Sequence, residues 1–357
     1  MFKKYLILLF FFALPLFSSA QNASWQKISY QKAQVLKVEE TVEKNENQVI
    51  SQQKIKIKIL SGPHKNEERE IENILSNNPL DLKIKAGDKI LIYEEQNNDQ
   101  DIIQIQSFYV LPILIFFIFL FLIVLLAIGG KQGAKAIISL SLSVFLIFKI
   151  LIPQMLQGKN PIYLSLAIAA IIAIITLLLI SGLKKKTFAA ILGTISGVAV
   201  AAGLASIFGN LAHLNGLSDE HARTLFSSFP YLNFKGILFA GIIIGALGAV
   251  MDVAMSISSS IAEVKKAQPE IKKTALIKSG MAVGKDIMGT MSNTLIFAYV
   301  GSSLFLLLLF NQYGESYLKF LNFNYVAEEI IRSIAGSIGL ILAIPITAII
   351  ASYLENK

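Results

Sequence analysis

Residues 236–263 read GILFAGIIIGALGAVMDVAMSISSSIAE, and this stretch decides the fold of the chain. It is apolar for longer than the roughly 20 residues that a helix needs to cross a bilayer. Asp252 lies about sixteen residues into it. An ionisable side chain at membrane depth is costly unless it faces a partner or water, so Asp252 is a candidate functional residue. The stretch therefore predicts a membrane protein with a polar site between packed helices.

The composition of the whole chain indicates the same class. Of the 357 residues, 54% are hydrophobic and 16% are charged, and the mean hydropathy is +0.61. Soluble proteins have about 25% charged residues. The formal net charge of +8 comes from lysines in short loops between apolar segments, which argues against a nucleic-acid partner. The chain has no cysteine, so disulfides and thiol chemistry are excluded.

Residues 107–357 are predicted to form an all-α polytopic bundle of about seven transmembrane helices. The apolar segments are 108–128, 135–153, 161–181, 188–209, 236–261, 287–310 and 330–353. Lysine and arginine are concentrated in the loops that face the cytoplasm if the first segment runs inward. The positive-inside rule then predicts a cytoplasmic C-terminus and an extracytoplasmic N-terminal part.

Residues 1–20 have the pattern of a secretory signal peptide. Lys3 and Lys4 form a basic start, an apolar run follows from Leu6 to Phe17, and Ser18-Ser19-Ala20 supplies small residues for cleavage. We expect cleavage after Ala20, with an uncleaved first helix as the alternative.

Residues 21–106 predict a small extracytoplasmic β-barrel-like domain of about five strands. Apolar and polar residues alternate in 54–60, in 82–85 and in 89–93, and 35–42 supplies a further strand. No group of residues in this domain indicates catalysis, so a docking or stabilising role is the favoured interpretation.

The polar residues around Asp252 share one helical face. At 3.6 residues per turn a continuous polar stripe is formed by Asp252, Ser256, Ser259 and Glu263. Gly241 and Gly245, upstream on the same segment, have the small-xxx-small spacing that allows two helices to approach closely.

A second polar stretch, SGMAVGKDIMGTMSNTLIFAYVG, covers residues 279–301. Asp286, Thr290 and Asn293 fall on one helical face of it. The density of glycine, from Gly280 to Gly289, predicts an unwound or re-entrant segment. The alternative for Asp286 is a helix N-cap at the cytoplasmic face.

Methionine clusters near the two aspartates. Carboxylate, amide and thioether groups together would suit a transition-metal ion such as Mn²⁺ or Fe²⁺, whereas packing is the alternative role of methionine. The candidate ion- or substrate-binding residues are Asp252, Asp286, Asn293, Ser256 and Met255, with Asp252 and Asp286 as hypothetical metal ligands.

Two further features lie at helix ends. Ser218–Arg223 reads as the capped start of an amphipathic helix, which is favoured over a metal site in the same loop. Arg332 is expected to pair with Glu328 or Glu329 or with a polar group on a neighbouring apolar segment, or to anchor the end of its helix at the interface.

The motifs of common enzyme classes are not found in the sequence. Asp252 and Asp286 formally provide the two aspartates of an intramembrane aspartyl protease, but their flanking residues do not match the motifs of such proteases. We therefore expect no enzymatic activity, and an intramembrane hydrolase is the third hypothesis.

Three long stretches carry a resemblance: GALGAVMDVAMSISSS (245–260), SGMAVGKDIMGTMSNTLIFAYVG (279–301) and RSIAGSIGLILAIPITA (332–348). They resemble the YibE/F-like family of bacterial multi-pass membrane proteins. The N-terminal part fits through 35–38, 60–64 and 86–88. The resemblance implies a permease-like protein of the bacterial cytoplasmic (inner) membrane, with an extracytoplasmic β domain before a helical bundle. It points to Asp252, Asp286 and Asn293 as motif positions and supplies no substrate.

The leading hypothesis is a transporter or channel-like protein for a small cation, of which a divalent metal is one case. Asp252 would be the principal ligand or a proton-coupled carboxylate. The alternative is a non-transporting scaffold or accessory subunit in the lipid bilayer, which binds a membrane or extracytoplasmic protein partner through its small-residue surfaces and its β domain.

Overall fold

The computed structural model of the chain describes residues 29–45, 48–76, 78–97, 100–312 and 316–356. The predicted signal peptide lies outside these residues. The chain divides into an N-terminal unit that ends at Val124 and a C-terminal unit that begins at Leu125.

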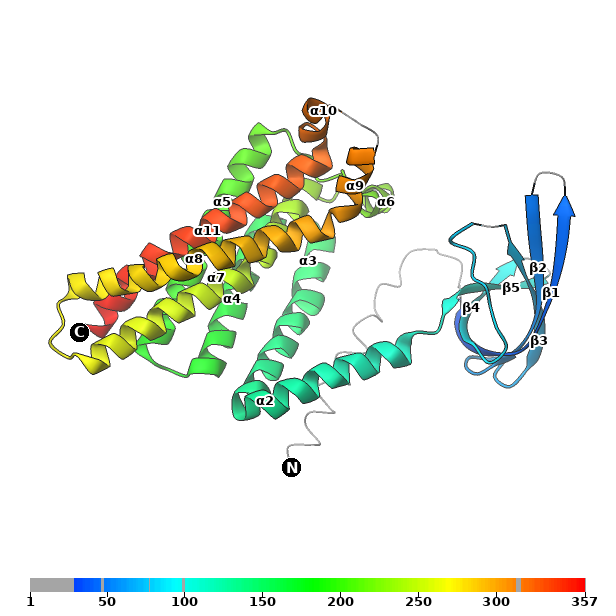
Figure 1. Ribbon diagram of the computed structural model, residues 1–357, viewed down its shortest axis with the longest axis horizontal. Coiled ribbons are helices and arrows are strands. Elements are labelled where there is room, and N and C mark those ends of the chain that lie inside the picture. The colour runs from blue at the N-terminus through cyan, green and yellow to red at the C-terminus, as the bar shows by residue number, and fades with distance from the viewer. Residues whose placement is uncertain (1–28, 46–47, 77, 98–99, 313–315, 357) are drawn as a thin grey trace. The chain divides into compact units, whose positions relative to one another are not determined.

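The N-terminal unit contains one five-stranded antiparallel sheet, curled into a half-barrel (Figure 1). The strand order is β3-β2-β1-β4-β5. The strands are β1 (Ser29–Asn45), β2 (Gln48–Ile59), β3 (Glu68–Leu75), β4 (Lys89–Asn97) and β5 (Gln100–Phe108). A small barrel-like domain of about five strands is therefore confirmed.

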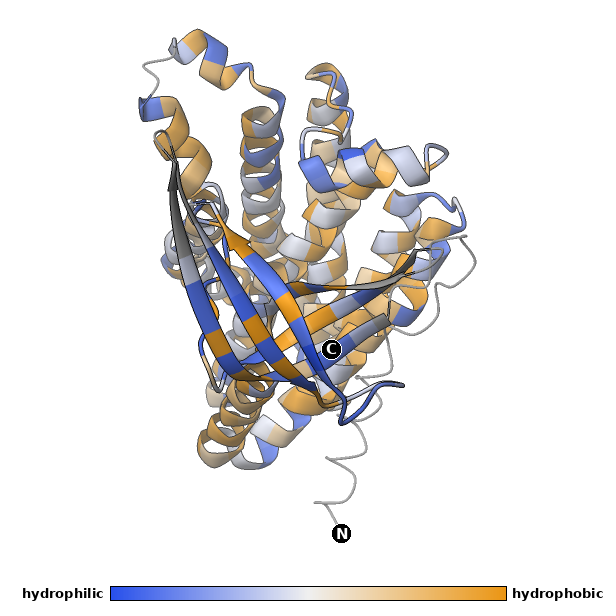
Figure 2. Ribbon diagram, turned by 90° about the vertical axis from the view of Figure 1, so that its right-hand side faces the viewer, coloured by the Kyte–Doolittle hydropathy of each residue, from blue (hydrophilic) through white to orange (hydrophobic). Residues whose placement is uncertain are grey.

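The sheet owes its core to the alternation seen in the sequence. Ile55, Ile57 and Ile59 of β2 are at most 1% exposed, and they pack with Ile90 and Ile92 of β4. The lysines between the isoleucines point the other way, because successive side chains of a strand face opposite sides. Figure 2 shows hydrophilic and hydrophobic residues alternating along the strands.

The expected strand at 82–85 is wrong, since this segment is irregular. Its apolar residue Ile84 is nevertheless 1% exposed. The side chain of Gln53 takes the place of a neighbouring strand: Ile84 N donates to Gln53 Oε1 and Gln53 Nε2 donates to Ile84 O, each over 3.1 Å. A buried side-chain amide can satisfy a backbone donor and acceptor as a neighbouring strand would. Ile84 can therefore be buried although residues 82–85 do not pair with a strand.

The membrane part is helical, and its helices fill the C-terminal unit (Figure 1). The helices are α2 (Leu111–Leu146, which begins in the N-terminal unit), the π-helix η2 (Ile147–Leu151), α3 (Ile152–Leu156), α4 (Pro161–Ser181), α5 (Lys185–Leu211), α6 (Glu220–Ser228), α7 (Phe234–Ala267), α8 (Lys273–Ser302), α9 (Leu304–Gln312), α10 (Tyr317–Leu321) and α11 (Asn324–Glu355).

Five helical stretches of the described chain are long and apolar enough to cross a membrane, and six if the bent pair α8 and α9 counts as one span. The predicted count was about seven. The two counts differ by one because two predicted segments, 108–128 and 135–153, lie on either side of a kink inside one stretch from Leu111 to Leu156, whose 46 residues are about twice the length of a single span. That stretch is interrupted at Gly130, whose φ of 50° and ψ of −124° are not helical.

The bundle is built on close packing of α5, α7 and α11 through small residues. A Cβ atom placed on Gly197 of α5 would lie 2.7 Å from Ala343 Cβ of α11 and 2.8 Å from Val250 Cγ1 of α7. The carbonyl oxygen of Gly339 is 2.9 Å from the same point. Small residues let helix backbones approach in this way, as is usual between membrane helices.

The expected unwound segment around Gly280 and Gly289 is wrong, because α8 is a continuous helix from Lys273 to Ser302. Two of its glycines serve close packing instead. A Cβ atom on Gly280 would lie 2.5 Å from Ile261 of α7, and one on Gly284 would clash with Ile344 of α11. The break comes later, at Ser303, where α8 and α9 meet at 61°.

Candidate functional site

The predicted polar stripe lies on one face of α7, and that face is open. Asp252, Ser256 and Glu263 are exposed and Ser259 is half-buried. The opposite side of the helix packs into the bundle, where Val250, Val253 and Ile257 are 0% exposed. The packing of the apolar side therefore turns the polar stripe away from the core.

Asp252 lies deep within its helix. At 1.5 Å per residue it is about 27 Å from Phe234 at one end of α7 and about 22 Å from Ala267 at the other. Among the described residues it has neither a hydrogen bond nor an ion pair with another side chain. An exposed carboxylate at this depth is costly in hydrocarbon, so it calls for water, a cation or a partner.

Two helices flank the polar stripe. On one side α8 approaches, where a Cβ atom on Gly245 would lie 2.7 Å from the hydroxyl oxygen of Tyr299. On the other side lies α4, whose Ser181 hydroxyl donates to the sulfur of Met255 over 3.5 Å. Met255 thus points toward α4 and packs with Leu177 and Ile191, at the edge of the stripe that contains Asp252.

Asp286 and Asn293 lie on a different surface. They are exposed together with Thr290, whereas Gly284 and Leu295 on the other side of α8 are buried. Helical periodicity places Asp286 and Asn293 on the face of α8 that is turned away from α7 and α11. The structure does not bring them together with Asp252. Asp286 is also no helix cap, because α8 begins 13 residues earlier, at Lys273.

The described residues contain no group of three or more His, Asp or Glu side chains that could hold a metal ion. Met281, Met288 and Met291 are partly buried and pack against the apolar core of the bundle, which is the alternative role considered for methionine. A hollow of about 180 Å³ between α4, α5 and α7 is lined by apolar residues such as Leu166, Val198 and Leu247 and contains none of the predicted site residues.

A second polar group of the bundle lies where α11 begins. Arg332 Nη1 forms an ion pair with Glu329 Oε1 at 3.2 Å, which confirms one of the two expected partners. The Arg332 guanidinium lies 6.0 Å from the centre of the Tyr299 ring. Tyr299 is not among the predicted site residues, although its position in a polar, glycine-rich stretch is a signal in the sequence.

Glu328 belongs to the same group and is only 6% exposed. Ser218 and the backbone of Gly216 lie near its carboxylate. Glu328 Oε1, Glu329 Oε2 and Ser218 Oγ are buried oxygen atoms that have no hydrogen-bond partner among the residues that the structure describes.

The loop between α5 and α7 contains the expected capped helix. Asp219 is the N-cap of α6, and its Oδ1 accepts from the backbone N–H of His221 over 2.7 Å. An aspartate cap satisfies one of the free N–H groups at the start of a helix.

Comparison with known proteins identifies the family. A family model described as YibE/F-like protein matches residues 117–357, and one described as YibE/F family N-terminal domain matches residues 27–108. No curated protein and no solved structure matches the chain. The two models together cover both the half-barrel sheet and the helical bundle, and the chain therefore belongs to the YibE/F-like family.

Proposed function

We propose that this membrane protein moves a small cation across the bilayer along the open face of α7, with Asp252 as the central binding group. The single observation that carries the proposal is the Asp252 carboxylate, exposed about midway along a 34-residue apolar helix and without a partner among the described residues. A carboxylate in that position attracts a cation because little else there offsets its charge.

Polar groups extend from Asp252 toward both ends of α7. Ser256, one turn away, supplies the nearest further oxygen on the same face, and Glu263 lies near the lysine-rich end of the helix. Toward the other end, Gly245 leaves the stripe open to the Tyr299 hydroxyl. Tyr299 leads on to the ion pair of Arg332 and Glu329. A cation would follow this line of oxygen atoms, and no catalytic step is part of the proposal.

The orientation follows from the lysine distribution. We place the protein in the cytoplasmic membrane, with the half-barrel domain outside and the C-terminus in the cytoplasm. Measurements with a panel of monovalent and divalent ions would identify the cation.

Flux into proteoliposomes tests the proposal. Asp252→Asn keeps the shape of the side chain and removes its charge, and we expect it to abolish ion flux. Asp286→Asn is the matched control, because this second carboxylate of a membrane helix lies on the far face of α8 and we expect its loss to leave flux intact. Flux through Asp252→Asn equal to the wild type would refute the proposed path.

Binding can be measured separately from movement. A cation at about 100 times its dissociation constant adds about 2.7 kcal/mol to the stability of the folded state. We expect one ion of the panel to raise the melting temperature of the wild type and not of Asp252→Asn.

A second candidate function, an accessory subunit, is favoured by a different observation. Cβ atoms placed on Gly241 and Gly248, on the same face as Asp252, would meet no atom of the described chain within 4 Å. A flat open helix face of this kind suits a partner helix. Because the chain has no cysteine, Gly248→Cys provides a single crosslinking position. Recovery of a stoichiometric partner from native membranes would support this role, with Gly203→Cys on the open side of α5 as the control.

A further inference from the structure

The connection between β2 and β3, residues 60–67, is folded against the start of β1. The Leu60 N–H donates to the Lys32 carbonyl over 2.7 Å, and the Lys32 N–H donates to the Ser61 hydroxyl over 2.9 Å. Gly62 has a φ of +88°, and a Cβ atom on it would lie 2.8 Å from Gln31 Cδ. This connection therefore covers Gln31, which is 1% exposed.

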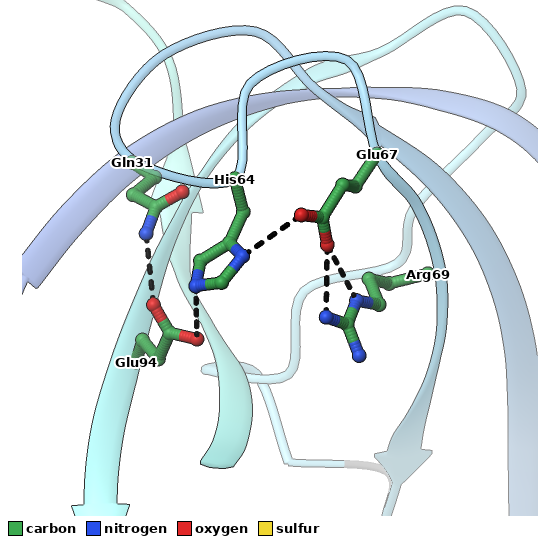
Figure 3. A network of polar contacts seen from close by, with 5 residues as sticks. All are labelled: Gln31, His64, Glu67, Arg69 and Glu94. Carbon is green, nitrogen blue, oxygen red and sulfur yellow. Dashed lines mark hydrogen bonds and ion pairs between the residues drawn. The ribbon is translucent and has the colours of Figure 1, made fainter.

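His64 stands at the centre of a polar network in this connection (Figure 3). Its Nδ1 lies 3.0 Å from Glu67 Oε1, and its Nε2 lies 3.6 Å from Glu94 Oε1. Glu67 belongs to the connection itself, whereas Glu94 belongs to β4. The imidazole ring thus joins two segments that are about 30 residues apart in the sequence.

Both carboxylates are held in place by further groups. Arg69 donates to Glu67 Oε2 from Nε at 3.2 Å and from Nη2 at 2.8 Å. Gln31 Nε2 donates to Glu94 Oε2 over 2.9 Å. Each carboxylate therefore keeps one oxygen for Arg69 or Gln31 and turns the other toward His64 (Figure 3).

This geometry selects the charged form of His64. An ionised carboxylate only accepts hydrogen bonds, so His64 Nδ1 donates to Glu67. Nε2, at 3.6 Å, is too far from Glu94 for a hydrogen bond and attracts it only through the charge of a protonated ring. A neutral imidazole carries one proton and can serve only one of the two carboxylates. The imidazolium carries two and serves both.

We propose that His64 is a proton-binding residue that fastens the tip of the β2–β3 connection to β4, so that loss of its proton loosens residues 62–67, while the hydrogen bonds of Leu60 and Ser61 keep the base of the connection on β1. The proton is the ligand. A metal ion fits poorly here, because the two ring nitrogens face different carboxylates and cannot both bind one ion.

The electrostatic surroundings agree with this role. The hydrogen bond that His64 donates to Glu67 raises the pKa of His64 above its ordinary value of 6.5, and the charges of Glu67 and Glu94 raise it further, against smaller opposing effects of burial and of the Arg69 charge. In turn, His64 and Arg69 lower the pKa of Glu67, which keeps that carboxylate ionised.

The direction of the pH effect follows. A pKa that is higher in the folded state means that the folded state binds the proton more tightly than the unfolded state. The stabilisation is therefore complete below the ordinary histidine pKa and is lost as the pH rises through the raised pKa. Residues 62–67 are fastened in mildly acidic solution and loosened in alkaline solution.

Ring-selective NMR of histidine in the full-length protein, reconstituted in nanodiscs, tests the proposal directly. The chain has only three histidines, so His64→Gln assigns the signal of His64. We expect its titration midpoint to lie above 6.5 and to fall in both Glu67→Gln and Glu94→Gln. These two variants keep the side-chain shape, so a failure to fold is less of a risk than with His64→Gln. His221→Gln, in α6, is the control and should leave the midpoint unchanged.

Hydrogen exchange provides the structural readout. The amides of Asn66 and Glu67 are bonded within the connection, to the carbonyls of Ile59 and His64. After correction for intrinsic rates, we expect their exchange to accelerate as the pH passes the His64 midpoint in the wild type, and to show no such step in Glu94→Gln. A midpoint at or below 6.5, or one that neither glutamate variant moves, would overturn the proposal whatever the outcome of the flux measurements.

Discussion

The contact between α5, α7 and α11 makes a prediction that a single methyl group can test. Gly197 of α5 lies where the three helices meet. Gly203 lies on the same helix, and no atom of the described residues is within 4 Å of the place where its Cβ would stand. Replacing each in turn by alanine adds the same atom to the same helix. Only the surroundings of the added methyl group differ.

The magnitude follows from the distances. The added Cβ at position 197 would stand 2.7 Å from Ala343 Cβ, while carbon atoms in contact are separated by about 3.5–4.0 Å. The helices must then move apart by about 1 Å, and overpacking of this kind typically costs about 1–3 kcal/mol. At position 203 the methyl group meets nothing, and alanine instead gains about 0.5–1 kcal/mol over glycine in a helix.

The assay is reversible unfolding in mixed micelles with increasing SDS, followed by the helical circular dichroism signal. We expect Gly197→Ala to unfold at a lower SDS fraction than the wild type and Gly203→Ala at an equal or higher one. Two results would refute this reasoning: a shift of both variants in the same direction, or a Gly197→Ala variant as stable as the wild type. Close packing of α5, α7 and α11 could then not be the reason that the polar face of α7 is turned away from the core.

Two further predictions concern side chains that replace regular structure. Gln53→Leu removes both hydrogen bonds to the Ile84 backbone and leaves two buried groups unpaired. The loss should cost about 1–3 kcal/mol for each group and expose the Ile84 amide to hydrogen exchange. Unchanged protection of that amide would contradict the role given to Gln53. Asp219→Ala removes the N-cap of α6 and should cost this helix about 1 kcal/mol, seen as faster exchange of the His221 amide, while Asp219→Asn, which keeps the accepting oxygen, should exchange much as the wild type does.

The sequence predicted the sheet well where alternation was accompanied by a partner strand. β2 and β4 are the expected stretches, and their isoleucines form the expected core. The same alternation at 82–85 misled the assignment, because burial of every second residue requires only an apolar neighbour and satisfied backbone groups. Gln53 supplies the latter from 31 residues away, and single-sequence periodicity contains no information about such a distant partner.

In the helical bundle, too, some features could be predicted from the sequence and others could not. Hydropathy located the apolar segments, because any long apolar helix must be buried in protein or lipid. Glycine was harder to interpret: the same residue marks the break at Gly130 and the tight contact at Gly284. Which of these a glycine serves depends on what stands opposite, and Ile344, the neighbour that closes on Gly284, comes from a different helix.

The candidate site was predicted in part for the same reason. Helical periodicity correctly grouped Asp252 with Ser256, and Asp286 with Asn293, on one face each. It could not state that the two faces diverge, because the rotation of α8 is set by the packing of Gly280 and Gly284 against α7 and α11. Two aspartates on successive helices therefore need not share a ligand.

What neutralises Asp252 must come from outside the packed core, since turning α7 would bury the carboxylate in place of Val250 and Ile257, which are fully enclosed. Water with a cation and a partner helix are the two proposed solutions, and Gly248→Leu separates them. Gly248 lies one turn from Asp252 on the same open face. A Cβ atom placed on Gly248 would meet no atom of the described chain within 4 Å. A small hydrated ion can pass beside one added side chain, whereas a close helix contact cannot form over it. Flux that persists in Gly248→Leu while Asp252→Asn abolishes it would favour the cation path. Loss of a partner crosslinked through Gly241→Cys when Gly248→Leu is added, with Gly203→Leu added as the control, would favour the accessory subunit.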